Sequence, residues 1–403
     1  MANNNRMTNL RSAGRDFVDA VFENAAENKV SFSIVPYNGQ VNVGPDLIDK
    51  YNVTHRHNNT YCVDMPASVY TTAALSRSLA MTQHAFADTY NTSSTGASYT
   101  TNDMAPLTAN RWCDPEPANR IRVHSNNVTQ LKNQITALQP IGATSIDAGM
   151  RWGAALLDPS ARGVVSELVY EGRVNSAFNG RPFNYGDPEV LKVLVLMTDG
   201  EHWPNEFINI AYKAGESPVF RNSDGRYSIF HSGVSGNTKY WVPHTGSWSQ
   251  VPWGGTVTES CTGNGNNKVC TTTLSNGSAV RLEWPQVWQQ LRVQWVANQL
   301  YRRAIGGSVT QYVNMFRSRE GTVIGAGPHE VSTMNSRLLD LCTRVKQQGV
   351  VIYTVAFEAP VAGRNLVRQC ASSNNHAFDV DGLEIRSAFS SIATSIRKLR
   401  LTQ

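Results

Sequence analysis

Residues 192–201 read KVLVLMTDGE, an apolar run that ends in an acidic turn. This pattern is typical of a central strand in a parallel sheet, buried on both faces. Residues 350–358, VVIYTVAFE, repeat it. The first run ends at Asp199 and the second at Glu358. Because ligands of open α/β sheets gather at the carboxyl ends of the strands, both carboxylates are expected at the binding edge.

Segments with helical spacing of apolar residues alternate with these strands. The spacing predicts a helix over 6–26, capped by Asn4 or Asn5, and further helices at 126–138, 141–159, 286–304, 331–348 and 383–401. A buried strand is expected at 29–38, with a hairpin to an edge strand at 39–44. The alternation predicts an α/β fold with a doubly wound, mostly parallel sheet.

Two stretches show no sustained periodicity, and both are rich in polar and aromatic residues. They cover residues 45–120 and 202–280. We therefore expect a single domain over residues 1–403 that carries these stretches as large irregular insertions.

The composition argues against a nucleic-acid-binding protein and against a membrane-spanning segment in these residues. The chain has 403 residues, 41% hydrophobic and 17% charged, with a formal net charge of +5. It contains no dense run of Lys and Arg, so nucleic acid is not an expected partner. It also contains no stretch of 18 or more apolar residues that could span a membrane.

Six cysteines are present, and none forms a CxxC pair of the kind that binds structural zinc. They are Cys62, Cys113, Cys261, Cys270, Cys342 and Cys370. Their even number in polar loops predicts three disulfides in an oxidising compartment. Cys261 and Cys270 flank a short polar loop that a bridge would close, and Cys342 and Cys370 are further candidates. The alternative is six reduced thiols in a cytosolic protein.

Asp199 has two interpretations when it is considered alone. It is either a turn-forming residue before Gly200 or a ligand for a hard cation such as Mg²⁺. Thr144, in the loop GATS before a predicted helix, could supply a hydroxyl ligand from a neighbouring turn.

Taken together, several segments resemble the von Willebrand factor A fold, and in particular the TadG-like proteins of tight-adherence (Flp) pilus assembly. The resemblance is carried by RMTNLRSAGRDFVD (6–19), VSFSIVPYNGQVNVG (30–44), IGATSIDAGMRWGAALL (141–157), VLVLMTDGE (193–201), GVVIYTVAFE (349–358) and the tail at 370–401.

The resemblance implies a metal-ion-dependent adhesion site with its threonine at Thr144 and its second aspartate at Asp199. The first loop of that site, Asp-x-Ser-x-Ser, and the central strand before it are expected just ahead of residue 6, and both are missing. Either the start of the chain is truncated or this member keeps the fold as a scaffold without the metal. Mg²⁺ or Mn²⁺ is therefore expected only if that loop is present.

Residues 240–255 of the second insertion, which is rich in Asn and Gly, contain three tryptophans, Trp241, Trp248 and Trp253. They are either partner or glycan contacts, or a small satellite core beneath a long loop. A hydrolase built on Asp199, Glu201 and His202 is a further alternative. No nucleophile elbow, P-loop or dinucleotide motif accompanies those residues, so an enzyme is not expected.

The function predicted from the sequence is a non-enzymatic role in Flp/Tad-type pilus assembly or adhesion, through contact with pilus or envelope proteins. The resemblance places the domain on the periplasmic side of the inner membrane of a bacterium, with a membrane anchor that these 403 residues do not show. The alternative is a metal-independent surface adhesin or glycan-binding module that uses the Trp-rich insertion.

Overall fold

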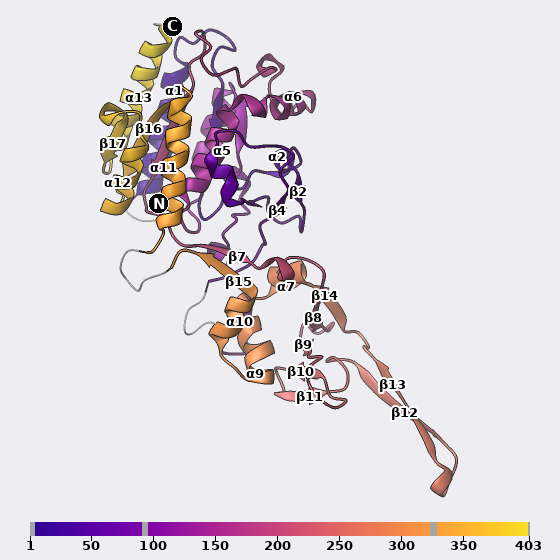
Figure 1. Cartoon of the computed structure of the whole chain (residues 1–403). Helices are drawn as coiled ribbons and strands as arrows, with labels where there is room; N and C mark the ends of the chain where they lie inside the picture. The colour runs from indigo at the N-terminus through magenta and orange to yellow at the C-terminus, as the bar shows by residue number, and fades with distance from the viewer. Residues whose placement is uncertain (1–4, 91–95, 323–328, 402–403) are drawn as a thin grey trace. The chain divides into compact units, whose positions relative to one another are not determined.

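A computed structural model describes residues 5–90, 96–322 and 329–401 (Figure 1). Asn4, one of the two predicted helix caps, lies outside these residues. The described chain divides into two compact units. Unit 1 comprises residues 1–84, 112–205 and 319–403, and unit 2 comprises residues 85–111 and 206–318. The assignment of the whole chain to a single domain with two insertions stays a prediction.

The helices of unit 1 are α1 (Arg6–Phe22), α2 (Pro45–Ile48), α4 (Val128–Ala137), α5 (Ile146–Leu157), α6 (Arg162–Tyr170), α11 (Ser332–Gln347), α12 (Val361–Cys370) and α13 (Glu384–Leu401). Its strands are β1 (Phe32–Ile34), β2 (Val53–Thr54), β3 (Val63–Asp64), β4 (Met81–Gln83), β5 (Arg122–Ser125), β6 (Val193–Thr198), β16 (Val351–Phe357) and β17 (Ala377–Val380). Two strands, β7 (Asn205–Ile208) and β15 (Arg317–Glu320), form a separate two-stranded sheet.

The helices of unit 2 are α3 (Thr101–Met104), α7 (Trp284–Gln290), α8 (Val293–Trp295), the π-helical segment η8 (Val296–Arg302), α9 (Arg303–Ile305) and α10 (Val309–Phe316). Its strands are β8 (Glu216–Arg221), β9 (Tyr227–Phe230), β10 (Tyr240–Val242), β11 (Ser247–Ser249), β12 (Thr256–Thr262), β13 (Val269–Ser275) and β14 (Val280–Glu283). The single helix predicted at 286–304 is therefore divided, and Leu291 at the end of α7 has extended backbone angles.

Unit 2 is built on a five-stranded antiparallel sheet with the order β11-β10-β9-β8-β14. Its core is aromatic: Trp284 stacks on Trp288 with ring centroids 5.2 Å apart, and Phe316 packs against both rings. Such large buried rings remove 150–250 Å² of apolar surface each and dominate the stability of a small core. This segment is therefore an independently packed unit rather than an irregular loop.

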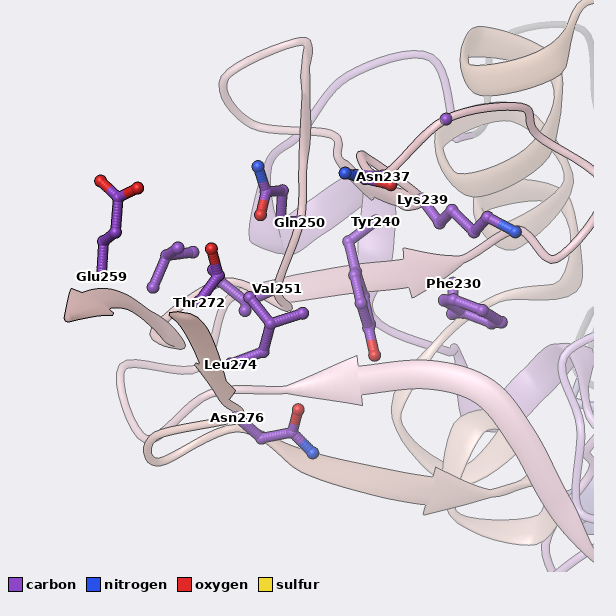
Figure 2. A pocket seen from close by; sticks show the side chains of 12 residues that line it. Phe230, Asn237, Lys239, Tyr240, Gln250, Val251, Glu259, Thr272, Leu274 and Asn276 are labelled. Carbon is purple, nitrogen blue, oxygen red and sulfur yellow. The ribbon is translucent and has the colours of Figure 1, made fainter. Parts of the chain in front are cut away.

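Strands β12 and β13 form an arm that belongs to no other sheet in the described chain. All residues of both strands are exposed, and the arm extends away from the five-stranded sheet (Figure 1). The predicted bridge between Cys261 and Cys270 crosses it near its tip. One face of the arm and the strands β9 and β10 line a groove, shown in Figure 2.

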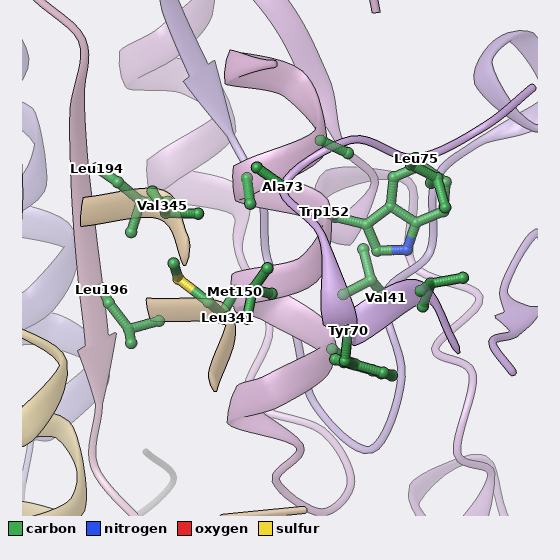
Figure 3. Packing of buried hydrophobic residues seen from close by; sticks show 14 of the residues in the cluster. Val41, Tyr70, Ala73, Leu75, Met150, Trp152, Leu194, Leu196, Leu341 and Val345 are labelled. Carbon is green, nitrogen blue, oxygen red and sulfur yellow. The ribbon is translucent and has the colours of Figure 1, made fainter. Parts of the chain in front are cut away.

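Unit 1 is organised around a three-stranded parallel sheet with the order β17-β16-β6. Successive residues of a strand point to opposite faces. Leu194 and Leu196 of β6 accordingly lie in one core with Leu341 and Val345 of α11 (Figure 3). Val355 and its alternate neighbours on β16 face the other core, which α1 and α13 cover.

The α/β class is confirmed, but a large doubly wound sheet is not. Only three strands form the parallel sheet, and most of the other strand pairs are antiparallel. The predicted strand at 29–38 is shortened to β1, which pairs with β5. The hairpin expected at 39–44 is absent from this segment: Asn42 instead makes an isolated parallel bridge to Arg120.

Residues 45–84 contribute to the core of unit 1 in spite of their irregular sequence. Ile48, Tyr51 and Tyr70 are buried in it, and Tyr51 packs edge-on against Trp152 of α5. The guanidinium of Arg151 is buried below them and donates to the carbonyls of Val69, Thr72 and Ala73. Short elements tied by a buried cation give this segment its order without any periodicity.

Three disulfides are present: Cys62–Cys113, Cys261–Cys270 and Cys342–Cys370. The first closes a loop with a sequence separation of 51, the kind of long closure that stabilises a fold by restricting the unfolded chain. No helix in the described residues combines the length and apolarity needed to cross a bilayer.

His124 on β5 makes the stability of unit 1 depend on pH. Burial, with a smaller contribution from the nearby Arg181, lowers the pKa of His124 to about 4. The unfolded chain takes up this proton near pH 6.5, so the neutral folded form loses stability as the pH falls from there towards 4. The loss approaches about 1.4 kcal/mol per pH unit for one group.

We expect urea unfolding to show a steeper loss of stability between pH 7 and pH 5 in the wild type than in His124→Gln. His84 is unchanged in both chains, so the difference isolates His124. Parallel pH profiles for the two chains would contradict this assignment.

Candidate functional site

Two carboxylates lie at the carboxyl edge of the parallel sheet. The register pairs Thr198 of β6 with Ala356 of β16, so the chain reaches Asp199 and Glu358 just beyond these paired residues. Arg6, in the first turn of α1, lies between them. Its Nε is 2.7 Å from a carboxylate oxygen of Glu358, and its Nη1 is 3.6 Å from one of Asp199. We call these three residues the edge triad.

Arg6 and Glu358 stabilise each other's charged forms. The Arg6 guanidinium, through its hydrogen bond, holds the pKa of Glu358 below its ordinary value. The Gly382 amide also donates to Glu358, over 3.2 Å, and lowers that pKa further. The same hydrogen bond raises the pKa of Arg6. Both acids thus meet a cation that stays charged at neutral pH.

Glu358 holds its position at a conformational cost. Its φ is +49°, in the left-handed region that side chains other than glycine rarely adopt. This costs about 1–2 kcal/mol, and residues held in such conformations cluster at functional sites. The Glu358 amide donates to Val380 O over 2.9 Å, which ties the strained residue to the end of β17.

The loop that carries Asp199 is closely packed. The Thr198 hydroxyl oxygen accepts from the Gly200 amide over 3.1 Å. A Cβ on Gly363 of α12 would stand 2.2 Å from the Gly200 carbonyl oxygen, so only glycine permits this approach. The Thr144 hydroxyl lies 3.2 Å from where a Cβ on Gly200 would stand. The structure therefore places Thr144 beside the turn at Asp199, and the role of both residues as metal ligands stays a prediction.

Tyr37 packs against the end of β6, two residues before Asp199. Its hydroxyl donates to the Met197 carbonyl over 2.5 Å, and its ring lies where a Cβ on Gly149 would come within 2.5 Å of it. Burial raises the pKa of the Tyr37 phenol, with smaller contributions in the same direction from Asp199 and Asp147. The phenol is therefore a fixed hydrogen-bond donor at neutral pH.

His202 does not serve as a base towards Asp199. The ring is buried, Nε2 accepts from the Asp147 amide over 3.0 Å, and Nδ1 lies 2.8 Å from Asn335 Oδ1. These two bonds occupy both ring nitrogens and assign the proton to Nδ1. His202 therefore anchors the loop after Asp199 to α5 and α11.

The described donors do not fit a tight Mg²⁺ site. Magnesium requires near-octahedral oxygen coordination and usually carboxylates. Thr144 and Asp199 offer one hydroxyl and one carboxylate, and the Arg6 guanidinium already stands beside that carboxylate. A second cluster of candidate ligands, Glu259 with Cys261 and Cys270, has both sulfurs in a disulfide, which is no longer a thiolate donor.

The tryptophans Trp241, Trp248 and Trp253 of the second insertion lie in unit 2. Trp241 is only 7% exposed, and its indole nitrogen donates to the Gln299 carbonyl. Trp248 packs on Trp241 with ring centroids 5.5 Å apart. Trp253 packs on His244 and donates to Asp224. The structure thus does not offer Trp241 to a partner. A contact through Trp248 or Trp253 stays a prediction.

The sequence analysis missed Arg6, Tyr37 and Gly363. One signal could have identified Arg6: helices that cover a parallel sheet usually begin near the carboxyl ends of the strands, and Arg6 opens such a helix. Tyr37 and Gly363 lie far from Asp199 in sequence, and their roles depend on close packing that no periodicity encodes.

No family model matches the chain, and no curated protein matches it. Among solved structures, the chain is similar to the vWF domain of the type V pili tip protein Mfa5 from Porphyromonas gingivalis. The two are 12% identical, the superposition covers 97% of this chain and 88% of that chain, and the TM-score is 0.36. Likeness at this level does not place the chain in a family.

Two substitutions at Glu358 separate its ion pair from its backbone strain. Glu358→Gln removes the charge and keeps the strain, so we expect a loss of about 1 kcal/mol in unfolding free energy. Glu358→Gly removes the charge and relieves the strain. It should therefore be more stable than Glu358→Gln in urea unfolding. The reverse order would contradict the strained conformation.

Proposed function

We propose that this chain is a non-enzymatic adhesion or assembly protein of the von Willebrand A type, which contacts a partner protein at the carboxyl edge of its parallel sheet. The observation that carries the proposal is the edge triad, in which a strained Glu358 and Asp199 hold Arg6 at a partly exposed edge. Side-chain exposures of 16–23% leave all three within reach of a partner.

The electrostatics of the edge favour contact over chemistry. Two carboxylates and one guanidinium leave a net negative charge, which favours a basic or cationic group on the partner. The nearby polar side chains are held in structural bonds: Tyr37 donates to Met197, and His202 accepts from the Asp147 amide and donates to Asn335. An arrangement of this kind positions charge and contains no base paired with a nucleophile among the bonds described.

The finer function follows the sequence resemblance. We propose that the partner is a component of a Tad/Flp-type pilus or of the cell envelope that assembles it. The three disulfides support an oxidising compartment, for which the periplasmic side of the inner membrane is our proposal. A metal-dependent contact is proposed only for a longer chain that supplies an Asp-x-Ser-x-Ser loop.

Metal independence of the 403-residue chain has a direct test. Because the described donors are too few, we expect the same melting temperature in millimolar Mg²⁺, Mn²⁺ or EDTA. A stabilisation by either ion that is lost in Asp199→Asn would contradict this account and restore the metal site.

The contact itself can be tested by genetic complementation. In a strain that lacks the gene, wild-type protein should restore piliation and surface attachment. Asp199→Asn/Glu358→Gln should restore at most a tenth of both, because the partner loses its charge contacts. Asp381→Asn, at a nearby exposed acid, is the matched control and should behave as wild type.

Electron microscopy of pili and counts of attached cells provide the readout, with protein level and melting temperature measured for every variant. Full complementation by the double variant would rule out the edge as the contact. An unchanged phenotype in the deletion strain would rule out the pilus role.

A further inference from the structure

Unit 2 contains a groove of about 840 Å³ between the arm and the five-stranded sheet. One wall is a face of the arm, with Val257 and Leu274. The other wall is formed by Tyr240 and Phe230, whose ring centroids lie 5.1 Å apart, and by Val251 (Figure 2). The groove lies within unit 2 and is separate from the edge triad of unit 1.

The two faces of the arm differ in chemistry. On the groove side the cross-strand pairs are Val257–Leu274, Glu259–Thr272 and Cys261–Cys270. On the opposite side they are the Thr and Ser pairs Thr256–Ser275, Thr258–Thr273 and Ser260–Thr271, and at the tip Thr262–Val269. Its apolar pair thus faces the aromatic wall, yet Val257 is 47% and Leu274 53% exposed. An apolar face turned towards a groove and left uncovered indicates a surface for a ligand.

The disulfide identifies which main-chain groups of the arm face outward. The Cα atoms of Cys261 and Cys270 are 4.0 Å apart, the short spacing of a pair that exchanges no ladder hydrogen bonds. The pairs Glu259–Thr272 and Val257–Leu274, two and four residues away, are of the same kind. Their amides and carbonyls point to the outer edges of the arm, and neither edge pairs with another strand in the described chain.

Both ends of the arm are fixed, which keeps its two strands in register. An isolated two-stranded hairpin is marginally stable in water. The bridge between Cys261 and Cys270 holds the register at its outer end, and the short segments beyond Thr256 and Ser275 join it to the sheet at the other. Unpaired edges are usually blunted because they recruit other strands. Here they are retained on the arm that forms one wall of the groove.

The opposite wall is preassembled and the ends of the groove are charged. Tyr240 contacts Phe220 as well as Phe230, and burial raises the pKa of its phenol. Glu259 lies at the arm end of the groove and Lys239 at the other end (Figure 2). A ligand that spans the groove therefore meets a carboxylate at one end and an ammonium at the other.

We propose that this groove binds an extended polypeptide segment of another protein. The segment adds a strand to an outer edge of the arm and places alternate apolar side chains between Leu274 and Tyr240. A basic residue then faces Glu259 and an acidic residue faces Lys239. An extended peptide can both hydrogen-bond to the row of main-chain groups and place apolar side chains against the walls. A glycan cannot, because it has no matching ladder of amides.

The test uses the full chain and a fluorescent seven-residue peptide, Lys-Thr-Val-Thr-Leu-Thr-Glu, whose charged and apolar residues share one face of an extended strand, in an anisotropy titration. The probe variant is Val257→Asp/Leu274→Asp. The matched control is Thr258→Asp/Thr273→Asp, which places the same two charges directly across the arm on its other face. We expect the probe variant to bind at least tenfold more weakly than the wild type and the control within twofold of it.

A peptide methylated on alternate amides tests the ladder and should also bind at least tenfold more weakly. No binding of the parent peptide up to about 1 mM protein, or equal binding by the wild type and the probe variant, would overturn the proposal. Two other results would give the groove a different ligand and would also overturn the proposal. These are dimerisation of the wild type that the probe variant loses, and glycan-array binding that the probe variant loses.

Discussion

The parallel pairing of β6 with β16 is the constraint on which the site in unit 1 depends. It brings the ends of two apolar strands to one edge, and each end carries a carboxylate. Two like charges so placed are unfavourable unless a cation joins them. Arg6 supplies that cation, and this requires α1 to begin at the same edge. The start of α1, the strained Glu358 and the packed turn at Gly200 all lie at this edge.

The arm of unit 2 is stabilised in a different way from the edge of unit 1. The edge of unit 1 gathers charge in closely packed, partly exposed loops, whereas the arm exposes every residue of its strands and is crossed by a covalent bridge that keeps its register. A protein with two such surfaces can engage partners of different chemistry, one through side-chain charge and the other through main-chain pairing.

The sequence predicts the regular parts of this molecule well. KVLVLMTDGE and VVIYTVAFE form the adjacent parallel strands β6 and β16, but only β16 is central and β6, predicted to be central, lies at the edge of the described sheet. The helices at 126–138, 331–348 and 383–401 are found with small changes at their ends. The approach of Thr144 to the Asp199 turn was also predictable, because both follow the topology of strand ends and helix starts. Periodicity is sufficient wherever a residue's role depends on which face of a helix or strand it occupies.

Other features depend on contacts that periodicity does not encode. Residues 45–84 are ordered by hydrogen bonds from Arg151 and by apolar side chains at irregular spacing. Because this spacing has no helix or strand period, the sequence predicted an irregular insertion. Trp241 is a core residue on β10, which pairs with a strand on each side, and the sequence does not reveal that position. The groove arises because an exposed hairpin turns Val257 and Leu274 towards Tyr240, residues that no motif connects.

The central claim is that Arg6 serves as the cation of the sheet edge and controls the charge of Glu358. A ¹³C NMR titration of the Glu358 carboxyl group tests this most directly. In the wild type its midpoint should lie clearly below the ordinary glutamate pKa of about 4.3, and Arg6→Gln should return it towards that value. An ordinary midpoint in the wild type, or one that Arg6→Gln leaves unchanged, would contradict the account.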